Sequence, residues 1–220
     1  MKVAVIVFPG SNCDNDAYHI FKRKLHLDVS FVWHKENDLS DYEMIFIPGG
    51  FSYGDYLRAG AIAKFSPIMN QVKIAADQGK LVMGVCNGFQ VLVESGLLPG
   101  SLITNKNVKF LSRDVELKVE SSSNKFTSNL NSGDILRMPI AHKQGNYIAT
   151  DREISELWDN GQVAFSYISN YNGSIDSIAG ITNIKGNVLG MMPHPERAGE
   201  SCLGSDDGLK IFNSVLNGLA

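Results

Sequence analysis

Three features that would restrict the kind of protein are missing from this chain: cysteine pairs, long apolar runs and clusters of basic residues. Only three of its 220 residues are cysteine, at positions 13, 86 and 202, and no two are spaced as C-x-x-C. This pattern argues against a disulfide framework and against a zinc site, and it suits a reducing cytoplasm. No apolar stretch reaches the roughly 18 residues of a membrane helix. We therefore expect a cytoplasmic protein that does not contact a membrane.

The charge balance excludes a second group of functions. The formal net charge is −3, from 20 basic and 23 acidic residues, and no basic run is present. Nucleic acids and anionic membranes attract proteins through clustered Lys and Arg, so neither is an expected partner. The chain is 44% apolar and contains 21 glycines. This composition is enough for a substantial α/β core, and we expect residues 1–220 to form a single domain.

Short β-branched runs alternate with amphipathic segments along the first half of the chain. Strands are expected at 2–8, 29–33, 44–47 and 81–85, and helices at 14–25, at 66–79 and after Cys86. Ser66 is expected to cap the second helix, with Pro67 in its first turn. Alternation at this spacing is typical of a parallel sheet with right-handed crossovers. The prediction is a three-layer α/β fold, in which helices flank an open, mostly parallel sheet.

The middle of the chain has a different pattern. Strands are expected at 108–110, 114–120 and 135–141, then at 162–168, 178–183 and 188–192, before a closing helix at 207–217. Polar turns separate the first of these strands, which is typical of antiparallel pairing. We therefore expect a small antiparallel excursion beside the main sheet.

The pentapeptide Gly84-Val85-Cys86-Asn87-Gly88 carries the strongest chemical signal. It follows an apolar strand and leads directly into helical residues. A strand that ends in G-x-C-x-G and turns at once into a helix is a nucleophile elbow with cysteine in place of serine. The glycines allow a tight, strained turn, and the positive end of the helix favours the reactive thiolate. The competing interpretation is a buried cysteine beside an ordinary glycine turn.

A histidine near the C-terminus supplies the base that such a thiol needs. His194 stands between Pro193 and Pro195, directly after the last expected strand. The prolines exclude a helix interior and fix the backbone past the strand end. Glu196 can lie on the same side of an extended segment as His194 and set its tautomer. Cys86, His194 and Glu196 are therefore the predicted catalytic residues.

A glycine pair after the strand at 44–47 is the candidate for stabilising an oxyanion. Gly49 and Gly50 follow Pro48, and paired glycines allow backbone N–H groups to turn toward a ligand. The N–H groups of Gly50 and Asn87 are the expected donors, although a simple turn is the competing interpretation. Because both glycines and the elbow follow parallel strands, they are expected to meet at one edge of the sheet.

Together these motifs resemble the class I, triad-type glutamine amidotransferases. The resemblance rests on residues 84–90, 48–51 and 193–197, and longer strings narrow it: FPGSNCD at 8–14, PGGFSYGDYLRAGAIA at 48–63 and MMPHPERA at 191–198. These strings are similar to the glutaminase subunits of phosphoribosylformylglycinamidine synthase, from purine biosynthesis. The similarity runs through nearly the full chain.

The resemblance implies a glutaminase that forms a thioester on Cys86, releases glutamate and passes ammonia to a synthase. Gln90 would then contact the bound glutamine and Phe51 would shape the pocket wall, beside Gly49 and Gly50. The competing interpretations are a half-buried amide that caps nearby backbone and a phenylalanine of the core. The sequence has no G-x-x-x-x-G-K-S/T phosphate loop, so we expect no cofactor or metal here and place ATP and magnesium on the partner. The implied partners are L-glutamine, a large synthase subunit and a small accessory subunit.

Several alternatives stay open. Related amidotransferases serve other synthases, and a cysteine peptidase or a non-enzymatic scaffold are further candidates. The family usually has Ala-His-Gly-Glu-Gly in the middle of the chain, where this sequence has Ala141-His142-Lys143-Gln144-Gly145, so this loop is left outside the catalytic residues. Residues 51–58 are either an interface or a turn in which Asp55 pairs with Arg58.

Overall fold

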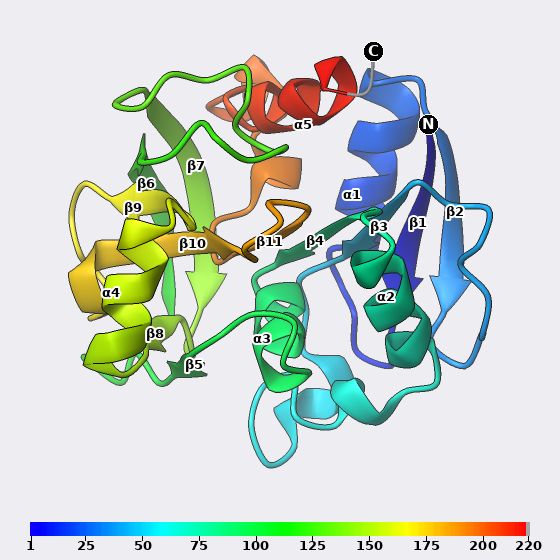
Figure 1. Ribbon diagram of the computed structural model, residues 1–220, viewed down its shortest axis with the longest axis horizontal. Coiled ribbons are helices and arrows are strands. Elements are labelled where there is room, and N and C mark those ends of the chain that lie inside the picture. Colours follow the sequence, from blue (N-terminus) through cyan, green and yellow to red (C-terminus); the bar gives the residue numbers. More distant parts are fainter. Residues whose placement is uncertain (219–220) are drawn as a thin grey trace.

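A mixed sheet runs through the computed structural model, which describes residues 1–218 (Figure 1). Over these residues it has nine strands in the order β2-β1-β3-β4-β11-β10-β9-β6-β7. The strands are β1 (Lys2–Val7), β2 (Asp28–Trp33), β3 (Met44–Ile47), β4 (Leu81–Val85), β6 (Leu111–Val119), β7 (Ile135–His142), β9 (Val163–Tyr167), β10 (Ile178–Thr182) and β11 (Val188–Met191).

The half of the sheet from β2 to β11 is entirely parallel. Its central strands β3 and β4, with the sequences MIFI and LVMGV, are buried along their whole length. Continuous apolar strands of this kind are typical of parallel sheets that are covered on both faces. The carboxyl ends of β1, β3, β4 and β11 consequently lie at one edge of the sheet. The predicted motifs come directly after these strands, so they meet at that edge.

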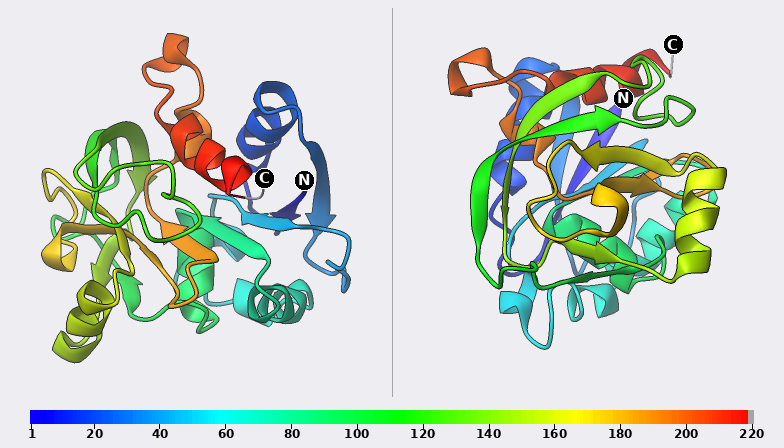
Figure 2. Two further views of the ribbon diagram at one scale, coloured as in Figure 1. Left: turned by 45° about the horizontal axis from the view of Figure 1, so that its top comes forward. Right: turned by 90° about the vertical axis from the view of Figure 1, so that its left-hand side faces the viewer.

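Helices cover both faces of the parallel half, as the left view of Figure 2 shows, with α1 and α5 on one side and α2 and α3 on the other. They are α1 (Asp14–His19), which continues as the π-helical η1 (Ile20–Lys24), α2 (Ile68–Asp77), α3 (Asn87–Glu94) and α5 (Gly208–Asn217). Phe21 of η1 packs edge-on against both Phe46 of β3 and Phe212 of α5, which joins the two helices to the sheet. The predicted three-layer α/β fold is confirmed.

The antiparallel strands extend the main sheet instead of standing beside it. β10, β9, β6 and β7 continue outward from β11, each antiparallel to its neighbour. A separate two-stranded antiparallel sheet consists of β5 (Ser101–Ile103) and β8 (Asn146–Ile148). Both of these short strands were missed by the sequence pattern, because three residues are too few to show a period.

Helix α4 (Asp151–Asp159) was also missed, although its start is encoded in the sequence. Thr150 accepts a hydrogen bond from the Glu153 backbone N–H, and the Glu153 carboxylate accepts one from the Thr150 backbone. This reciprocal capping box, T-x-x-E, marks a helix start. Short 3-10 segments complete the secondary structure: η2 (Ser52–Asp55), η3 (Ala63–Phe65), η4 (Ile175–Ser177), η5 (Pro195–Arg197) and η6 (Ser201–Leu203). Among the helices within residues 1–218, none is long and apolar enough to cross a membrane.

Two local predictions were wrong. Residues 108–110 form no strand, because Asn105 and Asn107 bond the backbone of Lys109 and hold a turn in which Val108 has φ 60°. Ser66 precedes α2, but its side chain makes no capping hydrogen bond within the described residues. Its hydroxyl instead bonds the Tyr53 hydroxyl at 3.0 Å.

The two ends of α3 offer a test of how tightly this helix is seated. A Cβ on Gly88 would collide with the carbonyl oxygen of Ile47, whereas a Cβ on Gly96 would meet nothing within 4 Å. Gly96 has φ 75°, so G96A should cost only the strain of a left-handed alanine, about 1–2 kcal/mol. We expect G88A to lower the free energy of unfolding by about 3 kcal/mol or more, measured by urea titration. Equal losses in the two variants would contradict this packing.

Candidate active site

Cys86 occupies a strained backbone position between β4 and α3. Its φ and ψ are 53° and −106°, a conformation that L-residues rarely adopt and that is held only by surrounding contacts. The Cys86 N–H donates to the carbonyl of Met191 in β11 at 2.8 Å. A Cβ on Gly84 would lie 2.6 Å from the Gly88 carbonyl, so the turn requires both glycines. The predicted elbow is present.

His194 and Glu196 form a buried pair at the start of η5. Glu196 Oε1 lies 2.6 Å from His194 Nδ1, and the two residues are 1% and 3% exposed. The His194 backbone N–H donates to the carbonyl of Pro139 in β7, which fixes the segment past the end of β11. The Glu196 contact at Nδ1 orients the imidazole and leaves Nε2 free to accept a proton. The structure thus brings together the two residues that the sequence predicted as base and orienting carboxylate.

The electrostatic setting makes His194 a strong base. Burial by itself would lower the pKa of His194, but the negative charge of Glu196, followed by that of the Cys86 thiolate, raises it well above its usual range. Within residues 1–218, Nε2 of His194 has no hydrogen-bond partner. The Cys86 thiol donates instead to the carbonyl of Ala141 at 3.7 Å. Catalytic hydrogen bonds are often long before substrate binds.

Two adjoining cavities open at Cys86. One, of about 200 Å³, lies on the side of His194, and the other, of about 170 Å³, lies on the side of Gln90. They share the following residues: Gly50, Phe51, Cys86, Phe110 and Ala141. The nucleophile therefore has the base on one side and a separate space for the rest of a substrate on the other.

The glycine pair lies where the sequence placed it. Gly50 lines both cavities, and Gly49 provides room for the reacting groups. A Cβ on Gly49 would lie 2.7 Å from His194 Cε1, 2.9 Å from Cys13 Sγ and 3.4 Å from Cys86 Cβ. The contribution of Gly49 is therefore steric: its missing side chain allows these three groups to converge.

Of the remaining predicted residues, Gln90 and Phe51 line the second cavity, and Asn87 is buried next to Gln90. Asn87 Nδ2 donates to Gln90 Oε1 at 2.9 Å, and Gln90 Nε2 donates to the carbonyl of Gln144 at 2.5 Å. Asn87 Oδ1 also accepts the Ser52 N–H at 3.1 Å, so the elbow helix is tied to the loop after β3. Phe51 is 46% exposed and belongs to the cavity rim, not to the core.

Three residues at the site were not assigned a role from the sequence. Cys13 is buried and accepts a hydrogen bond from Arg197 Nη2 at 3.1 Å. His142 lines the second cavity, and burial, followed by the positive charge of His194, lowers its pKa to about 4. Burial raises the pKa of Asp55, in the same cavity, to about 6. Cys13 and Asp55 lie in the segments that follow β1 and β3, and no local pattern marks them. His142 ends β7 next to the Lys143–Gln144 loop, a position that gave a weak signal in the sequence.

The loop after β3 also answers one question that the sequence left open. Arg58 pairs with Glu94 at the end of α3, through Nε to Oε1 and through Nη2 to Oε2 at 2.8 Å. It does not form the local pair with Asp55 that was considered above. This bidentate contact anchors the loop to the elbow helix and leaves Asp55 directed at the cavity.

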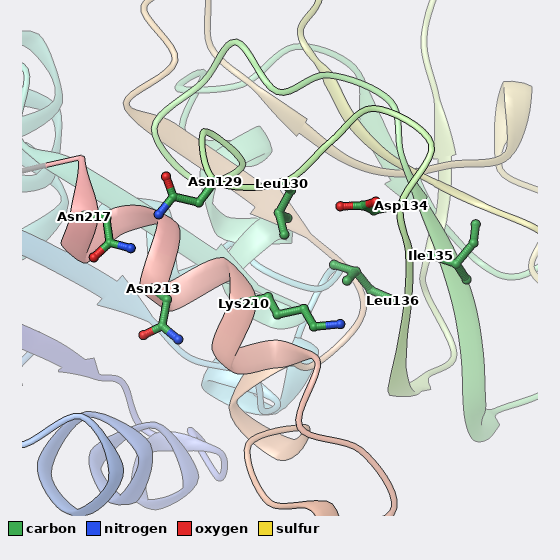
Figure 3. A pocket seen from close by; sticks show the side chains of 8 residues that line it. All are labelled: Asn129, Leu130, Asp134, Ile135, Leu136, Lys210, Asn213 and Asn217. Atoms are coloured by element: carbon green, nitrogen blue, oxygen red, sulfur yellow. The ribbon is translucent and has the colours of Figure 1, made fainter.

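A larger cavity lies elsewhere and carries no comparable chemistry. It measures about 460 Å³ and lies between α5 and the start of β7, lined by Asn129, Leu130, Asp134, Ile135, Leu136, Lys210, Asn213 and Asn217 (Figure 3). None of these side chains is a thiol or imidazole. The size of a cavity therefore does not identify the active site here, whereas the convergence of Cys86 and His194 does.

An α/β sheet with a cysteine elbow and a buried histidine–glutamate pair at its carboxyl edge defines a thiol-dependent amide-cleaving enzyme. Residues 1–206 match the CobB/CobQ-like glutamine amidotransferase domain, and the chain belongs to this family. It is 45% identical to a chain in the structure of PurLQS from Thermotoga maritima, with a TM-score of 0.92 over 100% of this chain and 99% of that one.

More distant structures have the same fold. A glutamine amidotransferase from Thermotoga maritima is 16% identical, with a TM-score of 0.58 over 89% of this chain and 76% of that one. The glutaminase domain of CTPS from Trypanosoma brucei, with bound acivicin, is 13% identical, with a TM-score of 0.59 over 99% and 94%. At these identities the likeness concerns the fold alone.

The charge coupling between Glu196 and His194 can be measured directly. E196Q keeps the shape of the side chain and removes the negative charge, so the pKa of His194 should fall. NMR titration of the His194 ring protons reports this change. E200Q is the control, because Glu200 contacts His19 instead and should leave the His194 titration in place. An unchanged His194 titration in E196Q would contradict the coupling.

Proposed function

We propose that this chain is the glutaminase subunit of phosphoribosylformylglycinamidine synthase. It hydrolyses L-glutamine to glutamate and ammonia, and the ammonia passes to a synthase that makes formylglycinamidine ribonucleotide in purine biosynthesis. The observation that carries the proposal is the strained Cys86 elbow beside the buried His194–Glu196 pair. A nucleophile, a base and an orienting group are the set that covalent amide cleavage needs.

The reaction follows from the positions of these groups. The Cys86 thiolate attacks the carboxamide carbon, and the N–H groups of Gly50 and Asn87 donate hydrogen bonds to the oxyanion. His194 transfers the thiol proton to the leaving nitrogen, so that ammonia departs and a thioester remains. Water then attacks the thioester with His194 as base, and Glu196 stabilises the imidazolium. Glutamate leaves, and the thiol is restored.

The second cavity has the charges that a free amino acid requires. Cys86 and Gln90 stand in the wall that would face the side-chain amide, and Asp55 and Lys143 line the same cavity. A carboxylate complements the α-ammonium group of glutamine, and a lysine complements its α-carboxylate. Phe51 lines both cavities at their rim. This arrangement favours a free amino acid, because a glutamine residue inside a peptide has neither an α-ammonium nor an α-carboxylate group to pair with Asp55 and Lys143.

The acceptor and the partners are inferred from similarity to the PurLQS chain across the full length. We propose that the synthase subunit holds ATP and magnesium, that a small accessory subunit belongs to the complex, and that this chain binds no cofactor. Exposed apolar side chains near the cavity, Tyr56 and Leu57 with Phe51 and Phe110, suit contact with the synthase. Within residues 1–218 the three cysteines form no disulfide, which suits the proposed reducing, cytoplasmic compartment.

The direct test is production of ammonia and glutamate with and without the synthase subunit. We expect weak hydrolysis by the chain alone and a clear increase when the synthase and its other substrates are present. C86A should abolish hydrolysis and also labelling by a glutamine-like chloroketone, since no thioester can form. C202A, which changes an exposed cysteine, is the matched control and should retain both. Hydrolysis by C86A would refute the proposed chemistry.

Asp55 gives the binding step a pH dependence. Its pKa of about 6 means that the carboxylate is charged above pH 6 and loses its attraction for the α-ammonium group below it. KM for glutamine should therefore rise as pH falls from about 7.5 to 5.5. D55N should raise KM about tenfold at pH 7.5 and remove this trend, with a smaller effect on kcat. Asn also tolerates the left-handed backbone of this position, where φ is 54°.

Steady-state kinetics across this pH range check the prediction. D41N, at an exposed carboxylate that pairs with Lys2, is the control and should behave as the unchanged chain does. If D55N shows an unaltered KM at pH 7.5, Asp55 does not bind the ammonium group.

A further inference from the structure

The loop after β3 contains a strained turn whose tip is open to solvent. Left-handed backbone occurs at three residues that have a Cβ, namely Tyr53, Asp55 and Leu57, whose φ angles are 54°, 54° and 69°. This region is unfavourable for such residues, and they stay in it only where surrounding contacts fix them. A Cβ on Gly54 would meet nothing within 4 Å, and Leu57 is 77% exposed. The contacts that fix the turn must therefore lie away from its tip.

The Tyr53 hydroxyl supplies such contacts. It hydrogen-bonds His34 Nδ1 at 2.9 Å and the Ser66 hydroxyl at 3.0 Å. The rings of Tyr53 and His34 also meet edge to face, with their centroids 5.6 Å apart. His34 and Ser66 are both buried, so the hydroxyl is bound inside the molecule. We call these three residues the Tyr53 clamp.

Both partners of Tyr53 belong to the ordered frame of the fold. His34 directly follows β2; its N–H donates to the carbonyl of Val7 in β1, and its carbonyl accepts the N–H of Ile68 in α2. Ser66 lies between η3 and α2. The clamp therefore ties the turn to the parallel sheet and to α2. This gives a role to a buried histidine that the reaction does not use.

The clamp lies two residues from a side chain that the binding step needs. Asp55 lines the second cavity. Asn87 Nδ2 donates to its carboxylate at 3.4 Å, a long contact that fixes it weakly. The Tyr56 N–H donates to the Tyr53 carbonyl, so Asp55 is enclosed in one turn with Tyr53. The direction of the Asp55 carboxylate consequently depends on where Tyr53 is held.

We propose that Tyr53 is a positioning residue for glutamine: held by the clamp, it keeps Asp55 facing the α-ammonium group of the substrate. The proposal rests on the proposed function, because that function assigns Asp55 to the ammonium group. Without the Tyr53 hydroxyl, the turn relaxes toward unstrained backbone and the carboxylate leaves the cavity. Among residues 1–218, no hydrogen bond joins the clamp to Cys86 or His194, so the thiol itself should react as before.

Two reagents that alkylate Cys86 separate this role from damage to the fold. A glutamine-like chloroketone has the α-ammonium group, whereas iodoacetamide has no charge. Y53F should lower the second-order rate of alkylation by the chloroketone about fivefold and leave the rate with iodoacetamide unchanged. Both rates are measured on the full chain by mass spectrometry of the peptide that contains Cys86. Y18F is the matched control, because Tyr18 stacks on Phe31 and not on the clamp.

A double-mutant cycle tests whether the effect passes through Asp55. Y53F and D55N act on the same interaction in the proposal, so the double variant should lose no more chloroketone reactivity than D55N alone. S66A removes one of the two bonds to the Tyr53 hydroxyl and should slow the chloroketone about twofold, again without affecting iodoacetamide. With the synthase present, Y53F should raise KM for glutamine about fivefold and leave kcat nearly unchanged.

The outcomes decide the proposal. A chloroketone rate that Y53F leaves unchanged would overturn it, and so would equal losses with both reagents, because these indicate damage to the elbow. Additive losses in the double variant would overturn it as well, since Tyr53 would then act apart from Asp55. If glutamine does not protect the unchanged chain from the chloroketone, the proposed function fails together with this proposal. Protection by glutamine with no effect of Y53F refutes the positioning role alone.

Discussion

The site depends on one strained backbone position, the left-handed turn at Cys86. The conformation is unfavourable for any residue with a Cβ, and it persists because β4 ends there and α3 begins at the next residue. Gly84 and Gly88 allow the strand and helix to approach, and the hydrogen bond from Cys86 to Met191 locks the turn onto β11. The sulfur is thereby presented at the carboxyl edge of the sheet, ahead of the positive end of a helix.

A second constraint acts on the groups that meet this sulfur. The imidazole, the Cys13 thiol and the Cys86 side chain converge on the space where Gly49 has no side chain. Glu196 holds the imidazole from behind, and its charge keeps the pKa of His194 high despite complete burial. Strong basicity and close packing are therefore produced by the same contacts.

Much of this organisation was predictable from sequence, for identifiable reasons. The parallel strands have continuous apolar runs, and the elbow and the segment around His194 are short motifs whose residues are adjacent in sequence. The roles of Cys13, Asp55 and His142 could not be predicted in this way. Cys13 and Asp55 depend on where a segment after a strand returns to the sheet edge, and His142 depends on where β7 ends in the sheet. The local sequence pattern encodes neither. The strand prediction at 108–110 was wrong because hydrogen bonds from asparagine side chains outweigh the β-propensity of Val108.

The central claim is that Cys86 is the nucleophile of amide cleavage, and interception of the thioester tests it most directly. The chain, with its synthase, is mixed with glutamine, quenched in acid during turnover, digested and examined by mass spectrometry. The account predicts a glutamyl adduct on the peptide that contains Cys86, which disappears when hydroxylamine cleaves the thioester. Sustained ammonia release with no adduct on that peptide, or with an adduct on another residue, would contradict it.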